Sequence, residues 1–257
     1  MAKKKDVEAD TSLVVGRNPV REALERRAAE IEKVMIQKGT SGRAIDAIRR
    51  AASEAGVAVQ YVPQQRLERL GPGLNHQGVA AIAAPIGYHV LEDLLTRIAP
   101  DLDAVRAKKP LLLLLDQLED PFNFGAILRS AVAAGADGVI VPKDGMAPLN
   151  AAALKASAGT ASRVPVARAG NLANAIEQLK ERGYWIAGAA SEGETSIWDL
   201  DWDRPIAIVI GSEARGLRSR VAAGCDHLVA IPMRGPAESL NASVVAGLFL
   251  FAAARVR

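Results

Sequence analysis

The sequence predicts an α/β protein of two domains, the larger of which holds a mostly parallel sheet covered by helices on both faces. From Leu111 onward, short and almost entirely apolar runs alternate with segments of helical periodicity. Residues 13–87 show the same alternation on a smaller scale. A chain of 257 residues with 49% hydrophobic and 24% charged residues can also bury a sizeable core.

Composition excludes several classes of protein. The net charge of +3 permits a polyanionic partner, but aromatic residues make up only 4%, which disfavours a sheet that stacks bases on rows of rings. The single cysteine, Cys225, excludes an internal disulfide and fits a reducing compartment. No apolar run follows Lys3–Lys5, and the longest run, Leu111–Leu115, is too short to cross a bilayer. We expect a cytoplasmic protein with no membrane partner.

The first domain is predicted to be a small α/β sandwich. Residues 1–12 mix lysines with acids and are expected to form a mobile tail. Asn18 is placed to cap the first helix, and a polar glycine-rich loop at 71–78 precedes the last strand. That loop is either a plain connection or a backbone surface for RNA. The predicted elements are helices at 19–27, 45–55 and 64–70, and strands at 31–36, 57–62 and 79–84.

Residues 88–109 are predicted to be a linker. They contain a weak helical segment at 90–98, followed by a charged stretch that ends before Pro110.

The second domain, residues 110–257, is predicted from regular βα alternation. Its strands are expected at 111–115, 138–141, 164–167, 185–189, 206–210 and 228–231. Its helices are expected at 125–134, 151–156, 173–182, 217–223 and 243–255.

Several common sites are unsupported by the sequence. It contains neither a G-x-G-x-x-G dinucleotide motif after the first strand nor a G-x-x-x-x-G-K-[ST] phosphate loop. The three histidines are scattered, so no zinc site is expected. The alternating Asp199, Asp201 and Asp203 lack the glycine and glutamate of a calcium loop and are interpreted as a solvated turn. No metal site is predicted.

Polar residues gather in three loops that follow strands, where open α/β sheets bind ligands. Asn123 is interpreted either as the cap of the following helix or as a functional group. Arg129 follows within an otherwise apolar helix, where an arginine near the first turn opposes the helix dipole and calls for an anionic partner. The second loop holds Glu213, and the third holds Ser239 and Asn241.

The three loops resemble the ordered motifs of one enzyme family. N-F-G-A-I-L-R (123–129), I-G-S-E-A-R-G-L (210–217) and I-P-M-R-G-P-A-E-S-L-N-A-S (231–243) are similar to those of the SpoU/TrmH branch of the SPOUT RNA methyltransferases. G-R-N-P-V-R-E-A-L (16–24) and H-Q-G-V-A-A (76–81) resemble that branch's substrate-binding domain. The domain arrangement is most similar to that of members that methylate a guanosine 2′-hydroxyl of 23S rRNA.

The resemblance implies a fold, a cofactor and partners. It implies a deep trefoil knot in the C-terminal domain, an L30e/L7Ae-like N-terminal sandwich, S-adenosylmethionine held largely by backbone groups, and a homodimer that acts on RNA. A tRNA guanosine 2′-O-methyltransferase and a non-catalytic ribosome-assembly factor are the alternatives. By motif position, the implied catalytic residues are Asn123, Arg129, Glu213, Ser239 and Asn241, and the implied cofactor-binding residues are Gly211, Ile231 and Leu240.

The reaction implied is methyl transfer to a ribose hydroxyl. Positive charge from Arg129 would stabilise the developing alkoxide, while Asn123, Ser239 and Asn241 orient the ribose or the arginine. A guanidinium, with a pKa above about 12, keeps its proton, so we expect a substrate phosphate or water to accept the proton of the hydroxyl. Glu213 is expected to hold a positive partner or an RNA-facing donor in place, or to be merely an acid at a helix N-terminus.

Overall fold

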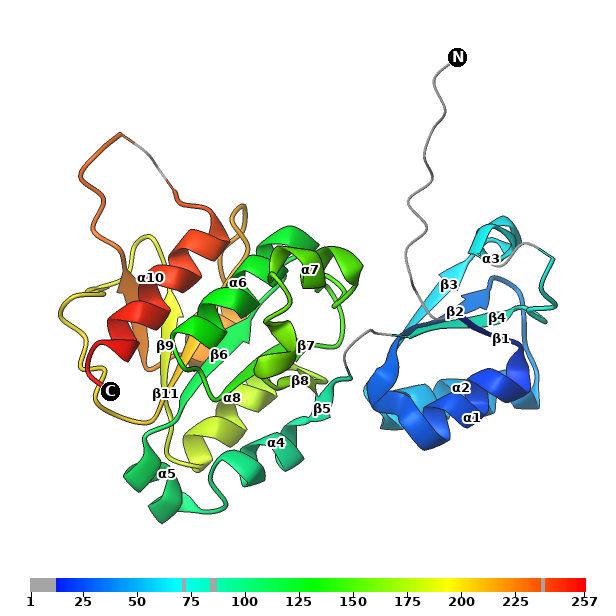
Figure 1. Cartoon of the computed structure of the whole chain (residues 1–257), viewed down its shortest axis with the longest axis horizontal. Coiled ribbons are helices and arrows are strands. Elements are labelled where there is room, and N and C mark those ends of the chain that lie inside the picture. The colour runs from blue at the N-terminus through cyan, green and yellow to red at the C-terminus, as the bar shows by residue number, and fades with distance from the viewer. Residues whose placement is uncertain (1–12, 71–72, 84–86, 237–238) are drawn as a thin grey trace. The chain divides into compact units, whose positions relative to one another are not determined.

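The computed structural model describes residues 13–70, 73–83, 87–236 and 239–257. The predicted mobile tail, residues 1–12, and Gly71 and Pro72 of the glycine-rich loop lie outside the described residues. Two compact units meet in the sequence at Gly87 and Tyr88 (Figure 1).

The first unit is built on a four-stranded sheet in the order β1-β4-β2-β3. β1, β2 and β3 run in one direction and β4 runs in the other. α1 and α2 bury residues such as Leu24 and Ile48 against one face, and α3 packs Leu67 against the other. The elements are β1 (Leu13–Val15), α1 (Arg17–Arg27), η1 (Ala28–Glu30), β2 (Ile31–Gln37), α2 (Arg43–Glu54), β3 (Ala58–Val62), α3 (Gln64–Leu70) and β4 (Val79–Ala83).

The start of α1 differs from the prediction. The helix begins at Arg17, and its N-cap is Gly16 with φ 95°, a backbone conformation that favours glycine. Asn18 therefore lies inside the first turn and is not the N-cap.

The second unit holds an eight-stranded sheet in the order β10-β12-β9-β11-β6-β7-β8-β5, with every pair parallel. α4, α5, α8 and α9 bury apolar residues in one core cluster, whereas α10 lies beside α6 and over β11 (Figure 1). β6 and β11 are buried along their whole length, as a sheet covered on both faces requires. The predicted α/β class is therefore confirmed for this unit.

The bounds of these elements follow the chain in order. They are β5 (His89–Val90), α4 (Leu91–Ile98), α5 (Leu102–Lys108), β6 (Leu111–Leu115), α6 (Pro121–Ala133), β7 (Gly138–Pro142), α7 (Ala151–Ala156), η2 (Ala161–Arg163), β8 (Val166–Ala169), α8 (Leu172–Glu181), β9 (Trp185–Ala189), β10 (Thr195–Ser196), β11 (Ile206–Ile210), α9 (Ser219–Gly224), β12 (His227–Ala230) and α10 (Ala242–Ala254).

The prediction of a linker at residues 88–109 is wrong. β5 pairs with β8 and extends the large sheet. Leu95 of α4 and Val105 of α5 are buried in the same core as Ile176. The charges that suggested a linker lie on the other sides of two short amphipathic helices, so the segment is an integral part of the second unit.

The route of the chain after β12 sets up the polar loops. β9 separates β12 from β11 in the sheet. The helix that follows β12 in the chain, α10, nevertheless packs on α6 and β11. The N-terminus of α10 is thereby returned to the loops that follow β6 and β11.

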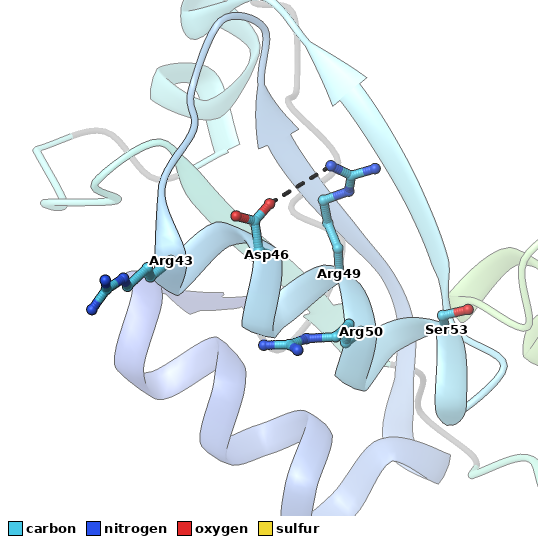
Figure 2. Close-up of a pocket in the computed structure, with 5 residues that line it drawn as sticks. All are labelled: Arg43, Asp46, Arg49, Arg50 and Ser53. Carbon is cyan, nitrogen blue, oxygen red and sulfur yellow. Dashed lines mark ion pairs between the residues drawn. The ribbon is translucent and has the colours of Figure 1, made fainter.

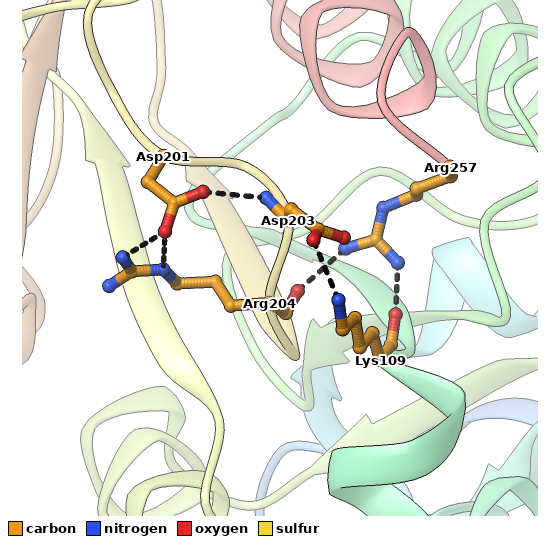
Figure 3. Close-up of polar contacts among 5 residues, drawn as sticks. All are labelled: Lys109, Asp201, Asp203, Arg204 and Arg257. Carbon is orange, nitrogen blue, oxygen red and sulfur yellow. Dashed lines mark hydrogen bonds and ion pairs between the residues drawn. The ribbon is translucent and has the colours of Figure 1, made fainter.

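The opposite, amino-terminal edge of this sheet is tied together by ion pairs (Figure 3). Lys109 pairs with Asp203 at 2.7 Å, and Arg204 pairs with Asp201. Arg257 donates to the backbone oxygens of Lys109 and Arg204. Two of the three aspartates interpreted as a solvated turn are thus partners of basic side chains.

Candidate active site

Three side chains from separate loops form one hydrogen-bonded cluster. Asn123 Nδ2 donates to Glu213 Oε1 at 2.9 Å. Asn241 Nδ2 donates to Asn123 Oδ1 at 3.0 Å and to Glu213 Oε1 at 2.7 Å. These residues are 90 and 28 positions apart in the sequence, so the fold alone brings them together. We call this set the polar cluster.

Asn123 is held by the start of α6. Asp120 is the N-cap of this helix and accepts hydrogen bonds from Phe122 N at 3.0 Å and Asn123 N at 3.4 Å, with Pro121 in the first turn. The interpretation of Asn123 as the helix cap is therefore wrong. Its side-chain amide points instead to the other two members of the cluster.

Asn241 is held by the start of α10, which it caps. Its Oδ1 accepts hydrogen bonds from Ser243 N at 2.9 Å and Ser243 Oγ at 2.5 Å. Because the oxygen is engaged by the helix, the amide nitrogen is the group presented to Glu213 and Asn123. Capping and cluster formation therefore use opposite ends of one side chain.

Glu213 lies in a tight turn that follows β11. Ser212 and Gly216 close this turn with two backbone hydrogen bonds of 3.1 and 2.8 Å. A Cβ at Gly211 would lie 2.3 Å from Gly216 C, so only glycine permits so close an approach. Glu213 Oε1 also accepts the N–H of Ala242, the first residue of α10, at 3.1 Å. The carboxylate thus serves a helix N-terminus, that of α10, and its donors are amides rather than a cation.

Two ion pairs that sequence reasoning missed join the first two loops. Asp116, which directly follows β6, is fully buried, and its Oδ1 lies 2.6 Å from the guanidinium of Arg218. Its Oδ2 accepts the backbone N–H of Arg218 at 2.9 Å. A second, exposed pair joins Arg215 to Glu119 at 3.0 Å. A charged residue directly after five buried leucines was the signal that could have identified Asp116.

Arg129 and Ser239 do not join the polar cluster. Arg129 lies in the third turn of α6 because the helix begins at Pro121, so the predicted conflict with the helix dipole does not apply. Both side chains are exposed, and neither makes a hydrogen bond or ion pair with any residue that the structure describes. The structure thus joins three of the five predicted catalytic residues.

The predicted cofactor-binding residues lie at the same edge of the sheet. Gly211 is buried directly after β11, Ile231 follows β12, and Leu240 precedes Asn241. Ile231 and Leu240 are half-buried, and within the described residues their backbone N–H groups donate no hydrogen bond. Apolar side chains beside free backbone donors fit a nucleoside cofactor held largely by backbone groups.

Cys225 precedes β12, at the amino-terminal edge of the sheet, and packs against the core of the second unit. Burial, with a smaller contribution from Asp226, raises the pKa of its thiol from 9.0 to about 12. The thiol is therefore neutral at physiological pH. No group of three or more His, Cys, Asp or Glu residues within the described ranges could hold a metal ion.

Comparison with known families accounts for both units. Residues 110–251 match the model of the SpoU rRNA methylase family, and residues 13–89 match the RNA 2′-O ribose methyltransferase substrate-binding domain. The chain belongs to the SpoU/TrmH family. It is an RNA methyltransferase, and its methyl donor is S-adenosylmethionine.

Individual relatives cover nearly the whole chain. A putative TrmH family tRNA/rRNA methyltransferase of Staphylococcus haemolyticus is 42% identical over 95% of this chain and 96% of its own. The 23S rRNA (guanosine-2′-O-)-methyltransferase RlmB of Xylella fastidiosa is 41% identical over 95% of this chain and 96% of its own. The solved structure of AviRb from Streptomyces viridochromogenes with its cofactor AdoMet is 26% identical, with a TM-score of 0.56, over 96% of this chain and 90% of its own.

No helix among the described residues combines the length and apolar character needed to cross a membrane.

Proposed function

We propose that this SpoU/TrmH enzyme methylates the ribose 2′-hydroxyl of a guanosine in 23S rRNA. The observation that carries the proposal is the polar cluster, in which one residue from each of the three motif loops is hydrogen-bonded to the others. The 41% identity to an RlmB favours 23S rRNA. A tRNA target is the second candidate, because other relatives are named tRNA/rRNA methyltransferases. A non-catalytic assembly factor has no need for the intact cluster.

The chemistry requires alignment and charge. S-adenosylmethionine, when bound, supplies a methyl group on a positively charged sulfur. We assign Gly211, Ile231 and Leu240 to its binding, through the free backbone groups of the half-buried residues. The ribose oxygen would accept that methyl group in place of its proton, which would pass to a substrate phosphate or to water. Arg129 stabilises the negative charge that develops on the oxygen, and it keeps its own proton.

The polar residues have separate roles in this scheme. Asn123, Asn241 and Glu213 hold the loops after β6 and β11 and the start of α10 in fixed relation through their shared hydrogen bonds. Ser239, which directly precedes Leu240 and whose side chain makes no hydrogen bond with the described residues, orients the ribose. Arg129 is free to meet an anionic or electron-rich partner because its guanidinium has none within the described chain.

We also propose a homodimer. Trp198 is 55% exposed and Phe251 of α10 is 54% exposed, and both line an apolar hollow of about 270 Å³ with Leu248. Exposed apolar patches of this kind favour protein contacts. A second copy of the chain is the assigned occupant, and it would supply the surroundings that Arg129 lacks. Phe251→Glu should give monomers in light scattering and lose activity, whereas Val90→Glu, an exposed residue of β5, should leave the dimer intact.

Three finer features of the family belong to the proposal. The packing of α10 on α6 and β11, after β12 has been placed beyond β9, supports a trefoil knot. The four-stranded sheet with helices on both faces supports an L30e/L7Ae-like first unit. A cytoplasmic location is also proposed, since ribosomal RNA is the assigned substrate.

One edge of the first unit suits RNA. The carboxyl ends of β1, β2 and β3 lie at this edge, and the segments at 16–18, 38–42, 63–66 and 73–78 contain no acidic residue. Arg17 begins α1, Lys38 follows β2, and Arg66 lies in the first turn of α3. Arg43 extends the positive charge onto α2, where a hollow of about 730 Å³ is lined by Arg43, Asp46, Arg49, Arg50 and Ser53 (Figure 2). Phosphate contacts made by such residues add affinity without sequence preference.

The test is methyl transfer from labelled S-adenosylmethionine to a panel of rRNA and tRNA transcripts, with the modified ribose mapped. We expect 23S rRNA to be labelled at one guanosine. Arg129→Ala should lower kcat by about 100-fold or more, in the range seen when a charge-stabilising donor is lost, while cofactor affinity changes little. Arg129→Lys, which retains positive charge, should keep part of the activity. Near-normal turnover by Arg129→Ala would remove the arginine from the mechanism.

A further inference from the structure

A groove at the carboxyl edge of the large sheet has no part in the site described above. It measures about 560 Å³, and its polar lining comes from the loop after β6, the start of α8, the segment between β11 and α9, and the start of α9. None of the residues assigned to the polar cluster or to the cofactor lines it. The polar side chains that line it are Gln117, Asn171, Arg215, Arg218, Ser219 and Arg220.

The charged side chains of this lining are all positive. Among the described residues, three guanidinium groups and no carboxylate line the groove. Arg218 is anchored by buried Asp116, and Arg215 by Glu119, each through one terminal nitrogen. Since a guanidinium has five N–H donors, each anchored arginine retains donors for a ligand while its position is fixed. Arg220 is exposed and has no ion-pair partner among the described residues.

The neutral residues of the lining complete a site for a sugar–phosphate chain. Ser219 offers a hydroxyl, while Gln117 and Asn171 offer amide donors. Asn171 uses its Oδ1 to cap α8 through Ala173 N at 2.8 Å, so its amide nitrogen remains available. Leu217 and Val221 add apolar surface. Planar guanidinium groups recognise phosphate oxygens, whereas the charge of Arg220, which no described carboxylate pairs, disfavours the positive sulfonium of S-adenosylmethionine.

The groove adjoins the polar cluster through one rigid turn. Glu213 and Arg215 lie two residues apart, so their Cα atoms are separated by at most about 7 Å. The turn is closed by the Ser212–Gly216 hydrogen bonds and by Arg215 N donating to Ser212 Oγ at 3.2 Å. Glu213 contacts Asn123 and Asn241, whereas Arg215 contacts Glu119 and lines the groove.

We propose that this groove binds the RNA backbone within one or two nucleotides of the target ribose, with Arg220 as the principal phosphate contact. The inference rests on the proposed function, and it adds a contact surface on the methyltransferase unit to that of the substrate-binding unit.

The test uses the full chain with Arg220→Ala and the matched control Arg106→Ala. Arg106 is an exposed residue of α5, which precedes β6 and therefore lies at the opposite edge of the sheet. Affinity is measured by the fluorescence anisotropy of a labelled 23S rRNA fragment over a series of KCl concentrations. Methylation kinetics and equilibrium dialysis of S-adenosylmethionine accompany it.

Arg220→Ala should weaken RNA binding and raise KM for RNA roughly tenfold, the lower end for loss of a charge-assisted hydrogen bond. The slope of log affinity against log salt should fall by about 0.7 to 1. The kcat and cofactor affinity should stay within about twofold, Arg220→Lys should recover most of the affinity, and Arg106→Ala should behave as wild type.

Equal RNA affinities and salt slopes for Arg220→Ala and Arg106→Ala would overturn the assignment, as would a loss of cofactor binding in Arg220→Ala. If the wild-type chain binds the RNA but methylates no transcript, the proposed function fails while the anisotropy series still decides the groove. If it methylates RNA and the two variants are alike, only the groove fails.

Discussion

Arg218→Ala should destabilise the second unit far more than Arg215→Ala, a substitution three residues earlier in the chain. Asp116, the partner of Arg218, is fully buried, and the variant would leave its Oδ1 without the guanidinium at 2.6 Å. Removal of one partner of a buried pair costs about 3–5 kcal/mol. Arg218 is itself 44% exposed, and Asp116 Oδ2 keeps the backbone N–H of residue 218. We therefore expect a loss of about 2–3 kcal/mol.

Arg215→Ala is the matched control. It removes an arginine that joins the same two loops, but the side chains of that pair are 65% and 70% exposed, so the expected cost is about 0–1 kcal/mol. Urea unfolding followed by tryptophan fluorescence measures both variants. All three tryptophans (185, 198 and 202) lie in the second unit, so the signal reports that unit alone. Equal midpoints for the two variants would refute the reasoning, because the burial of Asp116 would then have no energetic consequence.

Three further predictions address the site and the core. Glu213→Ala should lose more activity and more stability than Glu213→Gln, because the glutamine retains an acceptor oxygen for Asn123, Asn241 and Ala242 N. Calorimetry and methyl-transfer rates compare the two variants. Equal melting temperatures and equal rates would show that the shared oxygen is unimportant. Gly211→Ala should open the 211–217 turn and lower the melting temperature by several degrees, because the added Cβ would lie 2.3 Å from Gly216 O. An unchanged melting temperature and an unchanged cofactor affinity would contradict this prediction. Burial raises the pKa of Cys225 from 9.0 to about 12, so the neutral thiol is favoured in the folded state. Its contribution to stability is present below about pH 9 and is lost as pH rises toward 12. Iodoacetamide should therefore modify Cys225 at pH 8 only after unfolding, and rapid modification of the native chain would be the contrary result.

Three strands of the second unit were predictable because each is an uninterrupted apolar run. Residues 111–115, 185–189 and 206–210 form strands with the predicted bounds, since a strand buried on both faces has no polar position to blur its ends. Helix ends were less predictable because capping depends on backbone geometry. Asn18 and Asn123 are both good cap residues by type, yet Gly16 and Asp120 occupy the cap positions. The first unit's short β1 and the second unit's β5 and β10 carried too few residues for a periodic signal.

The sequence predicted which loops form the site, but it did not predict which of their side chains are hydrogen-bonded to one another. Asn123, Glu213 and Asn241 each follow or precede a strongly patterned element, which indicated that they lie at one edge of the sheet. Their hydrogen bonds depend on the return of the chain from β12 across β9, and the strand pattern alone predicted an ordinary open sheet. The pair of Asp116 and Arg218 spans 102 positions, and a buried carboxylate is recognisable only when its depth in the fold is known.

The contacts of the polar cluster distinguish two tasks of the motif residues: holding the loops in place and stabilising charge. The motif sequences alone do not say which residue has which task. Three donors already converge on Glu213 Oε1, and all are amides. A carboxylate satisfied in this way fixes the geometry of the three loops, and it does not neutralise a cation within the described chain. Arg129, in the third turn of α6, consequently keeps its full positive charge without a partner there. In the proposed mechanism, Arg129 is therefore the group assigned to charge stabilisation of the ribose oxygen, and the amide-bonded cluster is assigned to fixing the three loops.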